Sequence, residues 1–575
     1  MIYDGIRLDA TYGQIVAALD RELKSPSRLP LLISGVCGGA DTALCAALVH
    51  DRGPILILTG TERDAARMTA ALNAENIPAA VFPGREPVLY NIAASRSAEY
   101  ERLKVLLRLR RGELRAIAAV PGDALGYTMP PEILALAGFE LHTGGETDPA
   151  VLDESLAMFG YARCEMAEAP GQYARRGGIL DIFPSFSLEG EPHPFRVEFF
   201  GDEIDRIGIF DPDTQRTLEN RDSVFVSPAR ELLLTDEITA KLRNAVELRR
   251  KRAKTPEAER ELNGELAAID GKLPLDFADK YVTLVYPQKS TLLDYFSPDS
   301  PVLLCGKNAV QQQLDAALWR ERENIESLLN AGTIDAKYAD YMRDKAFLDL
   351  WLEKHAVLYL DSFLSTTGKG QGGVFTLNCR TGALAANREL LLSDLADYLS
   401  TGYRIVVSTA SAQESENLAA ILREASMAVS ICPTADVDCS ALSQNVVYLT
   451  VAPGVESFEL TGARFVFLSL AASGEKRSGS LRRGKRRHAK DTKKLTSYAD
   501  LKIGDYVVHE NCGIGIYLGI EQLTVDGVTR DYINIQYAGK DKLFIPTTQL
   551  DMVSKYIGAH SDDGTLKLSK MGGTE

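Results

Sequence analysis

The sequence lacks the features that mark metal-binding, secreted and membrane-spanning proteins. Its 8 cysteines are scattered over 575 residues and no two form a C-x-x-C pair. Structural zinc needs closely spaced ligands, so we expect no metal site and free thiols in a reducing compartment. The first residues are acidic and do not resemble a secretory signal. No apolar run reaches the roughly 18 residues of a transmembrane helix. We therefore expect a cytoplasmic chain with no membrane partner.

The sequence also lacks a positive charge balance. Its formal net charge is −15 and its pI is about 5.2, which excludes a protein that coats nucleic acid by charge alone. Any DNA contact must come from a local patch, and one lies in the linker 476–496, which we expect to be disordered on its own. This segment is either a soluble linker or a weak, salt-sensitive DNA contact. Its candidate DNA-binding residues are Arg482, Arg483, Lys485, Arg486 and Arg487.

The pattern of apolar residues predicts a multidomain α/β protein. Buried-strand runs alternate with amphipathic helices in 1–130, which favours a parallel sheet covered on both faces. Short strands and glycine turns in 131–215 indicate a mostly antiparallel insert. After the insert the mixed α/β pattern returns, and a second α/β domain follows it. The last pattern is a small all-β region with an Asp-Gly hairpin turn. We divide the chain at these changes into 1–130, 131–215, 216–375, 376–475, 476–496, 497–560 and 561–575.

A glycine-rich turn after the first expected strand partly matches the phosphate-loop template G-x-x-x-x-G-K-[ST]. Gly35 and Thr42 stand where the template requires them, but Ala40 replaces the second glycine and Asp41 replaces the lysine. A carboxylate repels phosphate where an ammonium attracts it. We therefore expect no ATP hydrolysis, no catalytic residue and no cofactor in this chain. The alternatives are an ordinary strand–helix turn and the remnant of a nucleotide-binding site.

Two other residues suggest chemistry but have simpler explanations. Asp361 ends the run LYLD, where a magnesium-binding carboxylate would lie, yet a strand-end cap is the favoured interpretation. His509 follows two valines, and no nucleophile or second ligand lies near it in sequence. We expect His509 to be a structural or surface residue.

Two charged motifs carry a resemblance to a known family. The first is Gln172-Tyr-Ala-Arg-Arg-Gly-Gly-Ile-Leu-Asp-Ile-Phe-Pro184, and the second begins with Phe195-Arg-Val-Glu-Phe-Phe200. Together they resemble the inserted domain with which the excision-repair protein UvrB docks on UvrA, and which recurs in transcription-repair coupling factors. The resemblance implies UvrA contacts by Arg175, Arg176, Arg196 and Glu198. The family's first arginine falls on Ala174, so Arg175 is the expected substitute. A solvated strand face with internal ion pairs is the alternative.

A second resemblance covers about 60 residues, from Leu501-Lys-Ile-Gly-Asp-Tyr-Val-Val-His-Glu510 to Asp541-Lys-Leu-Phe-Ile-Pro546. These residues resemble the RNA-polymerase-interacting domain that coupling factors share with CarD-type regulators. The resemblance implies an SH3/Tudor-like barrel that adds an edge strand to the polymerase β subunit. We place that edge near 530–537, with Tyr532, Ile533 and Ile535 as contacts. Half of the alternating apolar residues must be core, so core and interface remain open for each of them.

The order of these parts resembles the front half of a coupling factor, with 561–575 resembling the connector to its motor. In the family, that motor uses ATP and magnesium to move along DNA and displace stalled polymerase. We therefore predict a monomeric docking scaffold that binds polymerase and recruits UvrA without catalysis of its own. The alternatives are an active UvrB-like repair helicase, which Asp41 argues against, and a stand-alone CarD-like regulator, which Arg176 and Arg196 argue against.

Overall fold

The computed structural model describes most of the chain. The described residues are 3–85, 87, 89, 96–188, 190–253, 255–271, 275–361, 372–382, 388–432, 439–452, 455–470, 492–494, 504–509, 513–525, 528–537, 542–546 and 553–556. Within them, no helix is both long and apolar enough to cross a membrane.

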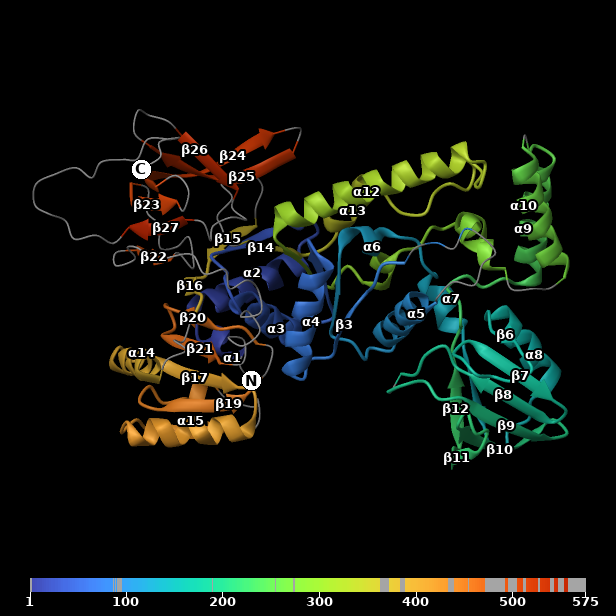
Figure 1. Cartoon of the computed structure of the whole chain (residues 1–575), viewed down its shortest axis with the longest axis horizontal. Coiled ribbons are helices and arrows are strands. Elements are labelled where there is room, and N and C mark those ends of the chain that lie inside the picture. The colour runs from blue at the N-terminus through green and yellow to red at the C-terminus, as the bar shows by residue number, and fades with distance from the viewer. Residues whose placement is uncertain are drawn as a thin grey trace, which may run out of the picture.

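A seven-stranded parallel sheet forms the platform of the molecule (Figure 1). Its order is β15-β1-β14-β13-β2-β4-β3, so strands from before and after the insert build one sheet. The strands are β1 (Leu31–Ser34), β2 (Ile55–Thr59), β3 (Ala79–Val81), β4 (Ala116–Ala119), β13 (Val302–Cys305), β14 (Val357–Asp361) and β15 (Gly373–Thr376). All six pairings are parallel, as the continuous apolar runs predict.

Helices cover both faces of the platform. Alternate residues of one strand separate the two cores: Leu56 and Leu58 lie on one face and Ile55 and Ile57 on the other. The first face packs against α5 (Ser97–Arg110), α6 (Pro121–Leu125) and α12 (Lys307–Asn330). The second packs against α1 (Asp4–Arg7), α2 (Ala10–Lys24), α3 (Ala40–Arg52) and α4 (Glu62–Ala74). The remaining platform helices are α9 (Asp236–Arg250), α10 (Pro256–Asp270), η1 (Asp276–Tyr281), α11 (Val282–Val285), η2 (Leu292–Tyr295) and α13 (Lys345–Leu352).

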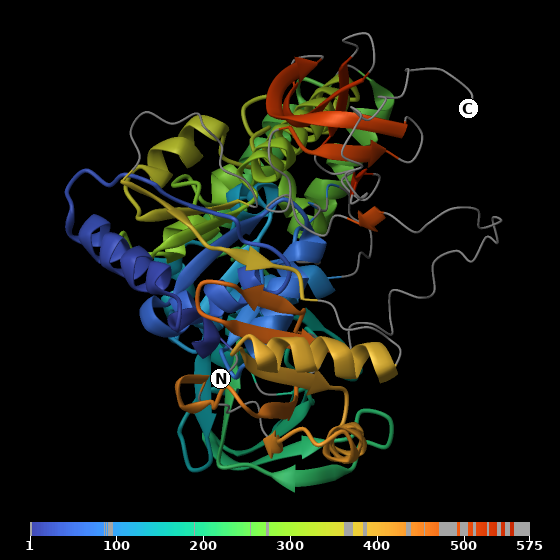
Figure 2. The ribbon, with the colours of Figure 1, turned by 90° about the vertical axis from the view of Figure 1, so that its left-hand side faces the viewer.

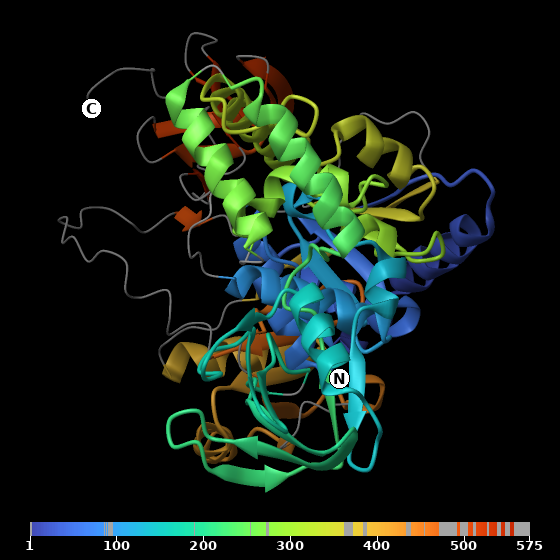
Figure 3. The ribbon, with the colours of Figure 1, turned by 90° about the vertical axis from the view of Figure 1, so that its right-hand side faces the viewer.

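The insert is a separate, mostly antiparallel sheet at one end of the platform (Figures 1 and 3). Its order is β11-β10-β9-β8-β7-β6, and only β6 and β7 pair in parallel. The strands are β6 (Ala162–Arg163), β7 (Gln172–Arg176), β8 (Ile179–Phe183), β9 (Phe195–Phe200), β10 (Glu203–Phe210) and β11 (Thr217–Asn220). The pair β5 (Phe139–His142) and β12 (Ser223–Val226) and the helices α7 (Pro131–Leu136) and α8 (Pro149–Met158) complete it. Strands β11 and β12 therefore follow the boundary expected at residue 215.

A second α/β unit lies at the other end of the platform (Figure 2). Its sheet has the order β16-β20-β21-β17-β19-β18, with parallel pairs from β21 to β18. The strands are β16 (Cys379–Arg380), β17 (Arg404–Thr409), β18 (Val429–Cys432), β19 (Val447–Val451), β20 (Phe458–Leu460) and β21 (Phe465–Ser469), and the helices are α14 (Arg388–Ser400), α15 (Ala412–Glu424) and η3 (Cys439–Ala441).

The last described segments form a six-stranded antiparallel sheet with the order β22-β27-β23-β24-β25-β26. The strands are β22 (Thr492–Lys494), β23 (Tyr506–His509), β24 (Gly513–Val525), β25 (Val528–Gln536), β26 (Lys542–Pro546) and β27 (Val553–Tyr556). The predicted all-β character is confirmed. Pairing between β22 and β26, which would close this sheet into a barrel, is absent from the pairings of the described residues.

Candidate docking face, phosphate loop and C-terminal sheet

The side chains of strand β9 alternate between the buried face of the insert and an outer face. Phe195 and Val197 are buried, Arg196 and Glu198 are half-buried, and Phe200 is 82% exposed. Side chains alternate along a strand, so Arg196, Glu198 and Phe200 share the outer face. The buried residues pack toward α8 and the β5–β12 pair.

A row of charged residues crosses this outer face. Strand register places Glu198 between Ile179 of β8 and Arg206 of β10, and Ile179 lies opposite Arg176 of β7. Arg206 Nη1 lies 3.9 Å from Glu198 Oε1. The sheet thus brings together three of the four predicted docking residues, Arg176, Arg196 and Glu198, although they come from strands 20 residues apart in sequence.

A buried carboxylate holds the two arginines of this face. Asp181 is 1% exposed and accepts hydrogen bonds from Arg196 Nε at 2.6 Å and from Arg176 Nη2 at 2.6 Å. The Arg196 guanidinium also lies 4.8 Å from the centre of the Phe210 ring and donates to the side chain of Gln215. The hydrogen bond to Asp181 raises the pKa of Arg196. Arg196 is therefore fixed inside the face, whereas Arg176 keeps 48% of its side chain exposed.

Arg175 lies on the opposite side of the sheet. It pairs in register with the buried Leu180, and its Nη1 is 4.0 Å from Asp153 Oδ2 on α8. The outer-face position next to Asp181 belongs to Ala174. The pleat of β7 thus separates Arg175 from the other predicted docking residues, so it cannot replace the missing arginine on this face.

Sequence reasoning missed three residues of the face: Asp181, Phe200 and Arg206. An aspartate inside the apolar run ILDIF was the available signal for Asp181, because a buried charge needs a partner. Phe200 and Arg206 could have been found by extending the period-two pattern of Arg196 and Glu198 along the hairpin.

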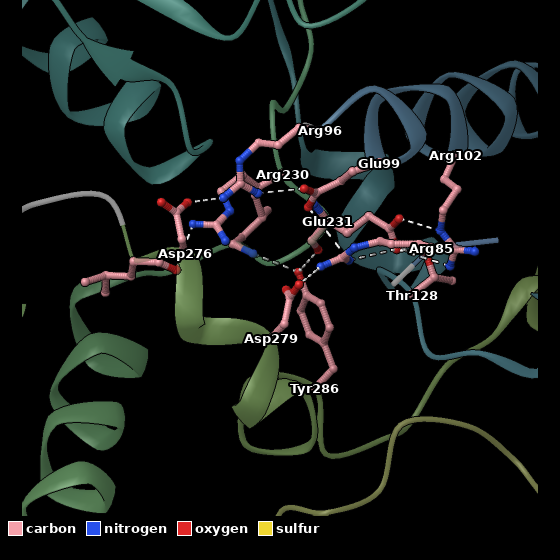
Figure 4. Close-up of polar contacts among 12 residues, drawn as sticks. Arg85, Arg96, Glu99, Arg102, Thr128, Arg230, Glu231, Asp276, Asp279 and Tyr286 are labelled. Atoms are coloured by element: carbon pink, nitrogen blue, oxygen red, sulfur yellow. Dashed lines mark hydrogen bonds and ion pairs between the residues drawn. The ribbon is translucent and has the colours of Figure 1, made fainter. Parts of the chain in front are cut away.

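An ion network joins the insert to the platform (Figure 4). Helix α5 and the segment before it contribute three arginines and a glutamate. An arginine and a glutamate follow the insert, and two aspartates come from η1. The charges balance as four arginines and four carboxylates: Arg85, Arg96, Arg102, Arg230, Glu99, Glu231, Asp276 and Asp279. Burial costs ionised groups less when each has an opposite partner, so the balance allows the network to be buried.

Glu231 is the centre of the network and is 0% exposed. Its carboxylate accepts from Arg102 Nε at 2.6 Å and from Thr128 Oγ1 at 2.6 Å, and its carbonyl accepts from Tyr286 Oη at 2.9 Å. Its backbone N–H donates to Glu99 Oε1 at 2.8 Å. The segment that leaves the insert is therefore tied to α5 through both its side chain and its backbone.

The pKa of Glu99 shows that the network stabilises the ionised form of its carboxyl. Burial raises the pKa of this carboxyl, but Arg85, Arg230 and Arg96 outweigh burial and lower it to about 2. Beside the network lies a cavity of about 570 Å³, lined in part by Arg102, Asp123 and Tyr341. Burial raises the pKa of Asp123 to about 6.

The glycine-rich turn that partly matches the phosphate-loop template lies between β1 and α3, as predicted, and its charged residue is already paired. Asp41 accepts from Arg67 Nη2 of α4 at 2.6 Å and from Nη1 at 3.2 Å. The hydrogen bond to Asp41 and its charge raise the pKa of Arg67 even though burial opposes this. Thr42 Oγ1 donates to the carbonyl of Gly39 at 2.8 Å, and Ala40 is 0% exposed. The hydroxyl and the carboxylate are thus both engaged by the protein.

The second α/β unit covers this loop. The N–H of Gly39 donates to the carbonyl of Ser457 at 3.3 Å, and the N–H of Cys37 donates to Cys379 Sγ at 3.0 Å. A phosphate loop binds phosphate through such free backbone N–H groups. At the end of β14, Asp361 accepts from the backbone N–H of Lys307 at 3.0 Å. Asp361, predicted as a strand-end cap or turn residue, thus ends β14 and binds the first backbone N–H of α12.

The edge position expected near 530–537 is wrong for most of that segment. Strand β25 lies between β24 and β26, and Tyr532 to Gln536 pair with Pro546 to Lys542. Ile535 is 0% exposed and belongs to the core. For Tyr532 and Ile533 the structure gives backbone pairing only. The outermost strands are β26 and β22.

The linker residues Arg482, Arg483, Lys485, Arg486 and Arg487 lie outside the described residues.

Two family models match the chain in the regions that carry these features. Residues 139–232 match the UvrB interaction domain, which contains the outer face of the insert. Residues 501–557 match the CarD-like/TRCF RID domain, which contains most of the C-terminal sheet.

Curated relatives cover most of the chain. The chain is 29% identical over 564 residues to the transcription-repair-coupling factor of Bacillus subtilis, a match that covers 95% of this chain and 46% of the relative. It is 29% identical over 490 residues to that of Staphylococcus epidermidis, and 28% identical over 494 residues to that of Staphylococcus aureus. Each of these two matches covers 83% of this chain and 40% of the relative.

The chain thus spans less than half the length of the curated relatives it matches. The two domain matches fall in the two regions where the sequence resembles a UvrA-docking insert and an RNA-polymerase-interacting domain. Together with a relative whose match covers 95% of this chain, they support a similarity of the chain to the N-terminal part of transcription-repair-coupling factors.

Proposed function

We propose that this chain is a docking scaffold of transcription-coupled DNA repair, which recruits UvrA through its insert and holds RNA polymerase through its C-terminal sheet. The observation that carries the proposal is the charged outer face of the insert, where the buried Asp181 fixes Arg176 and Arg196 beside Glu198. Preorganised arginines pair with carboxylates at low entropic cost, and a mixed-charge row sets the orientation of a partner.

Arg176 is the residue on this face best placed to contact UvrA. It is half exposed, lies beside the tight turn at Gly177, and donates a hydrogen bond to Asp181. Arg196 acts mainly by positioning, because 16% of its side chain is exposed. Glu198 and Arg206 complete the row, and Arg175 is not part of this contact.

Reversing the charge of Arg176 should weaken UvrA binding by about 30-fold, the roughly 2 kcal/mol expected of an interface hot spot. Arg176→Glu would be compared with Arg175→Glu by biolayer interferometry against immobilised UvrA. Arg175 is the matched control, because it is the same residue type on the same strand but on the opposite face. Equal losses for the two variants, with unchanged circular dichroism, would place the docking face elsewhere.

For RNA polymerase we propose that docking uses a free edge of the C-terminal sheet. Edge addition needs unpaired backbone N–H and C=O groups, which an outermost strand offers. Among the described residues of this sheet, strand β26 pairs with β25 and with no second strand. Of the residues predicted from sequence, Ile535 is buried core. Tyr532 and Ile533 stay proposed as contacts beside this edge, because they pair with Pro546 and Ile545 of β26. The linker 476–496 is a proposed weak DNA contact.

We also propose that these residues bind no ATP and that the scaffold acts as a monomer. The charge pair of Asp41 with Arg67 and the protein contacts at Gly39 support the first point. They argue against an active UvrB-like helicase. The coverage of the chain by coupling factors, insert included, argues against a stand-alone CarD-like regulator. In the whole protein, we propose that an ATP-driven DNA translocase supplies the force that displaces stalled polymerase.

A further inference from the structure

Two thiols that are far apart in sequence meet at the phosphate-loop remnant. Cys37 lies in the loop after β1, and Cys379 is the first residue of β16. Their Sγ atoms are 3.3 Å apart. Cys379 Sγ also donates to the carbonyl of Gly35 at 2.6 Å and accepts from the N–H of Cys37 at 3.0 Å. Three contacts therefore hold the two sulfur atoms against each other.

The position of Cys379 is the joint between the two large sheets. Strand β15, the edge of the platform sheet, ends at Thr376, and β16 begins the sheet of the second α/β unit at Cys379. The N–H of Leu377 still donates to Ser34 of β1 at 2.9 Å, whereas Cys379 already pairs with Leu460 of β20. A covalent bond here would join the loop of the platform to the point where the chain enters the second unit.

The packing around the thiols keeps this joint in one position. A Cβ added at Gly35, whose φ is +75°, would lie 2.4 Å from the carbonyl oxygen of Leu377, and one added at Gly38 would lie 2.7 Å from that of Ser457. Backbone atoms of the joint at Leu377 and of the second unit at Ser457 thus lie directly against the loop on both sides of Cys37. The two sulfur atoms need to approach by little more than 1 Å to reach bonding distance, about 2 Å.

We propose that Cys37 and Cys379 are a thiol pair that oxidises to a reversible disulfide and locks the second α/β unit to the platform. The oxidant is a hydroperoxide, with hydrogen peroxide as the simplest case. The Cys37 sulfur attacks one peroxide oxygen, which gives a sulfenic acid and one water. The Cys379 sulfur then attacks the Cys37 sulfur, and the hydroxyl leaves with the Cys379 proton as a second water. Two thiols are oxidised and one peroxide is reduced.

The surroundings set the order of these two steps. Cys37 is half-buried and Cys379 is 2% exposed, so the oxidant reaches Cys37 first. The hydrogen bond with Cys37 and burial raise the pKa of the Cys379 thiol, which protects it from direct attack. It remains in contact with Cys37 Sγ, where it can resolve the sulfenic acid. The disulfide closes a loop of more than 300 residues, which restricts the unfolded chain and stabilises the joint.

The test is peroxide treatment of the full folded chain at neutral pH, alkylation of remaining thiols, and mass spectrometry of a tryptic digest without reductant. The expected product links peptides 29–52 and 370–380, disappears with dithiothreitol, and is accompanied by a rise of a few degrees in the midpoint of thermal unfolding. Cys37→Ser should abolish both effects, whereas Cys45→Ser, which changes the other cysteine of peptide 29–52, should preserve them.

Cys164 supplies an internal control, since this half-buried thiol lies in the insert and contacts a backbone carbonyl. The proposal is overturned if Cys164 is modified while Cys37 is recovered as free thiol or sulfinic acid without the cross-link. It is also overturned if the cross-link persists in Cys37→Ser or in a second variant, Cys37→Ala, or if it forms without raising the midpoint.

Discussion

Replacing Glu231 with glutamine is expected to lower the free energy of unfolding by about 3–5 kcal/mol, the cost of removing one partner from a buried ion pair. Glutamine keeps the size of the side chain but not its charge. The Arg102 guanidinium, which is 3% exposed, would then be buried without its carboxylate. The hydroxyl of Thr128 would lose a charged acceptor at 2.6 Å. Urea unfolding followed by circular dichroism measures the change.

The matched control is Glu237→Gln on α9. Glu237 also pairs with a cation, Lys241 at 2.6 Å, but 78% of its side chain is exposed. Water replaces an exposed partner easily, so this variant should unfold like the parent chain. If Glu231→Gln unfolds at the same urea concentration as Glu237→Gln, the network does not hold the insert on the platform.

Gly39→Ala is the second substitution with a large expected effect. We expect it to lower the free energy of unfolding by about 3 kcal/mol. The new Cβ would lie 2.0 Å from the carbonyl oxygen of Glu456 and 2.7 Å from its carbon. These are backbone atoms of the second α/β unit, so no side-chain rotation relieves the contact. The phosphate loop and the second unit would have to separate. Thermal unfolding monitored by tryptophan fluorescence and by circular dichroism measures the loss.

Gly13→Ala is the opposite control. Gly13 is the fourth residue of α2, and a Cβ there would meet nothing within 4 Å. Alanine stabilises a helix more than glycine does, so the free energy of unfolding of this variant should rise by about 1 kcal/mol. The same glycine-to-alanine change is therefore expected to lower the free energy of unfolding at residue 39 and to raise it at residue 13. A neutral or stabilising Gly39→Ala would show that the second unit does not rest on the loop.

The platform and the second α/β unit were predictable because a parallel sheet buries both faces of its strands. Continuous apolar runs such as LLIS in β1 and ILILT in β2 therefore identify the strands directly. The antiparallel insert followed from its glycine turns. Strands β11 and β12 lie beyond the expected end at residue 215, because polar residues such as Glu219 and Ser223 do not indicate strands.

The edge of the C-terminal sheet could not be predicted, because alternation identifies a strand but not its neighbours. The pattern around Tyr532, Ile533 and Ile535 correctly indicated a strand, yet the pairing with β26 depends on contacts made by residues 542–546. The orientation of Arg175 could not be predicted for a different reason. Arg175 and Arg176 are neighbours in sequence, but the pleat places them on opposite faces of β7.

The ion network and the thiol pair lay beyond sequence reasoning altogether. Glu231 and Arg102 are separated by 129 residues, and Cys37 and Cys379 by 342. No local pattern connects such positions, because their meeting depends on how the platform, the insert and the second unit assemble. A charged residue inside an otherwise apolar stretch, as Arg230 and Glu231 are before Leu232, is the only local sign that a buried partner exists.

The central claim is that one chain carries two independent docking sites. The most direct measurement is the mass distribution, by mass photometry, of the chain mixed with UvrA and RNA polymerase. The account predicts a species that contains all three proteins, and predicts that Arg176→Glu removes UvrA from it while the polymerase complex remains. Competition between UvrA and polymerase for the chain, or binding of neither to the folded chain, would contradict the account.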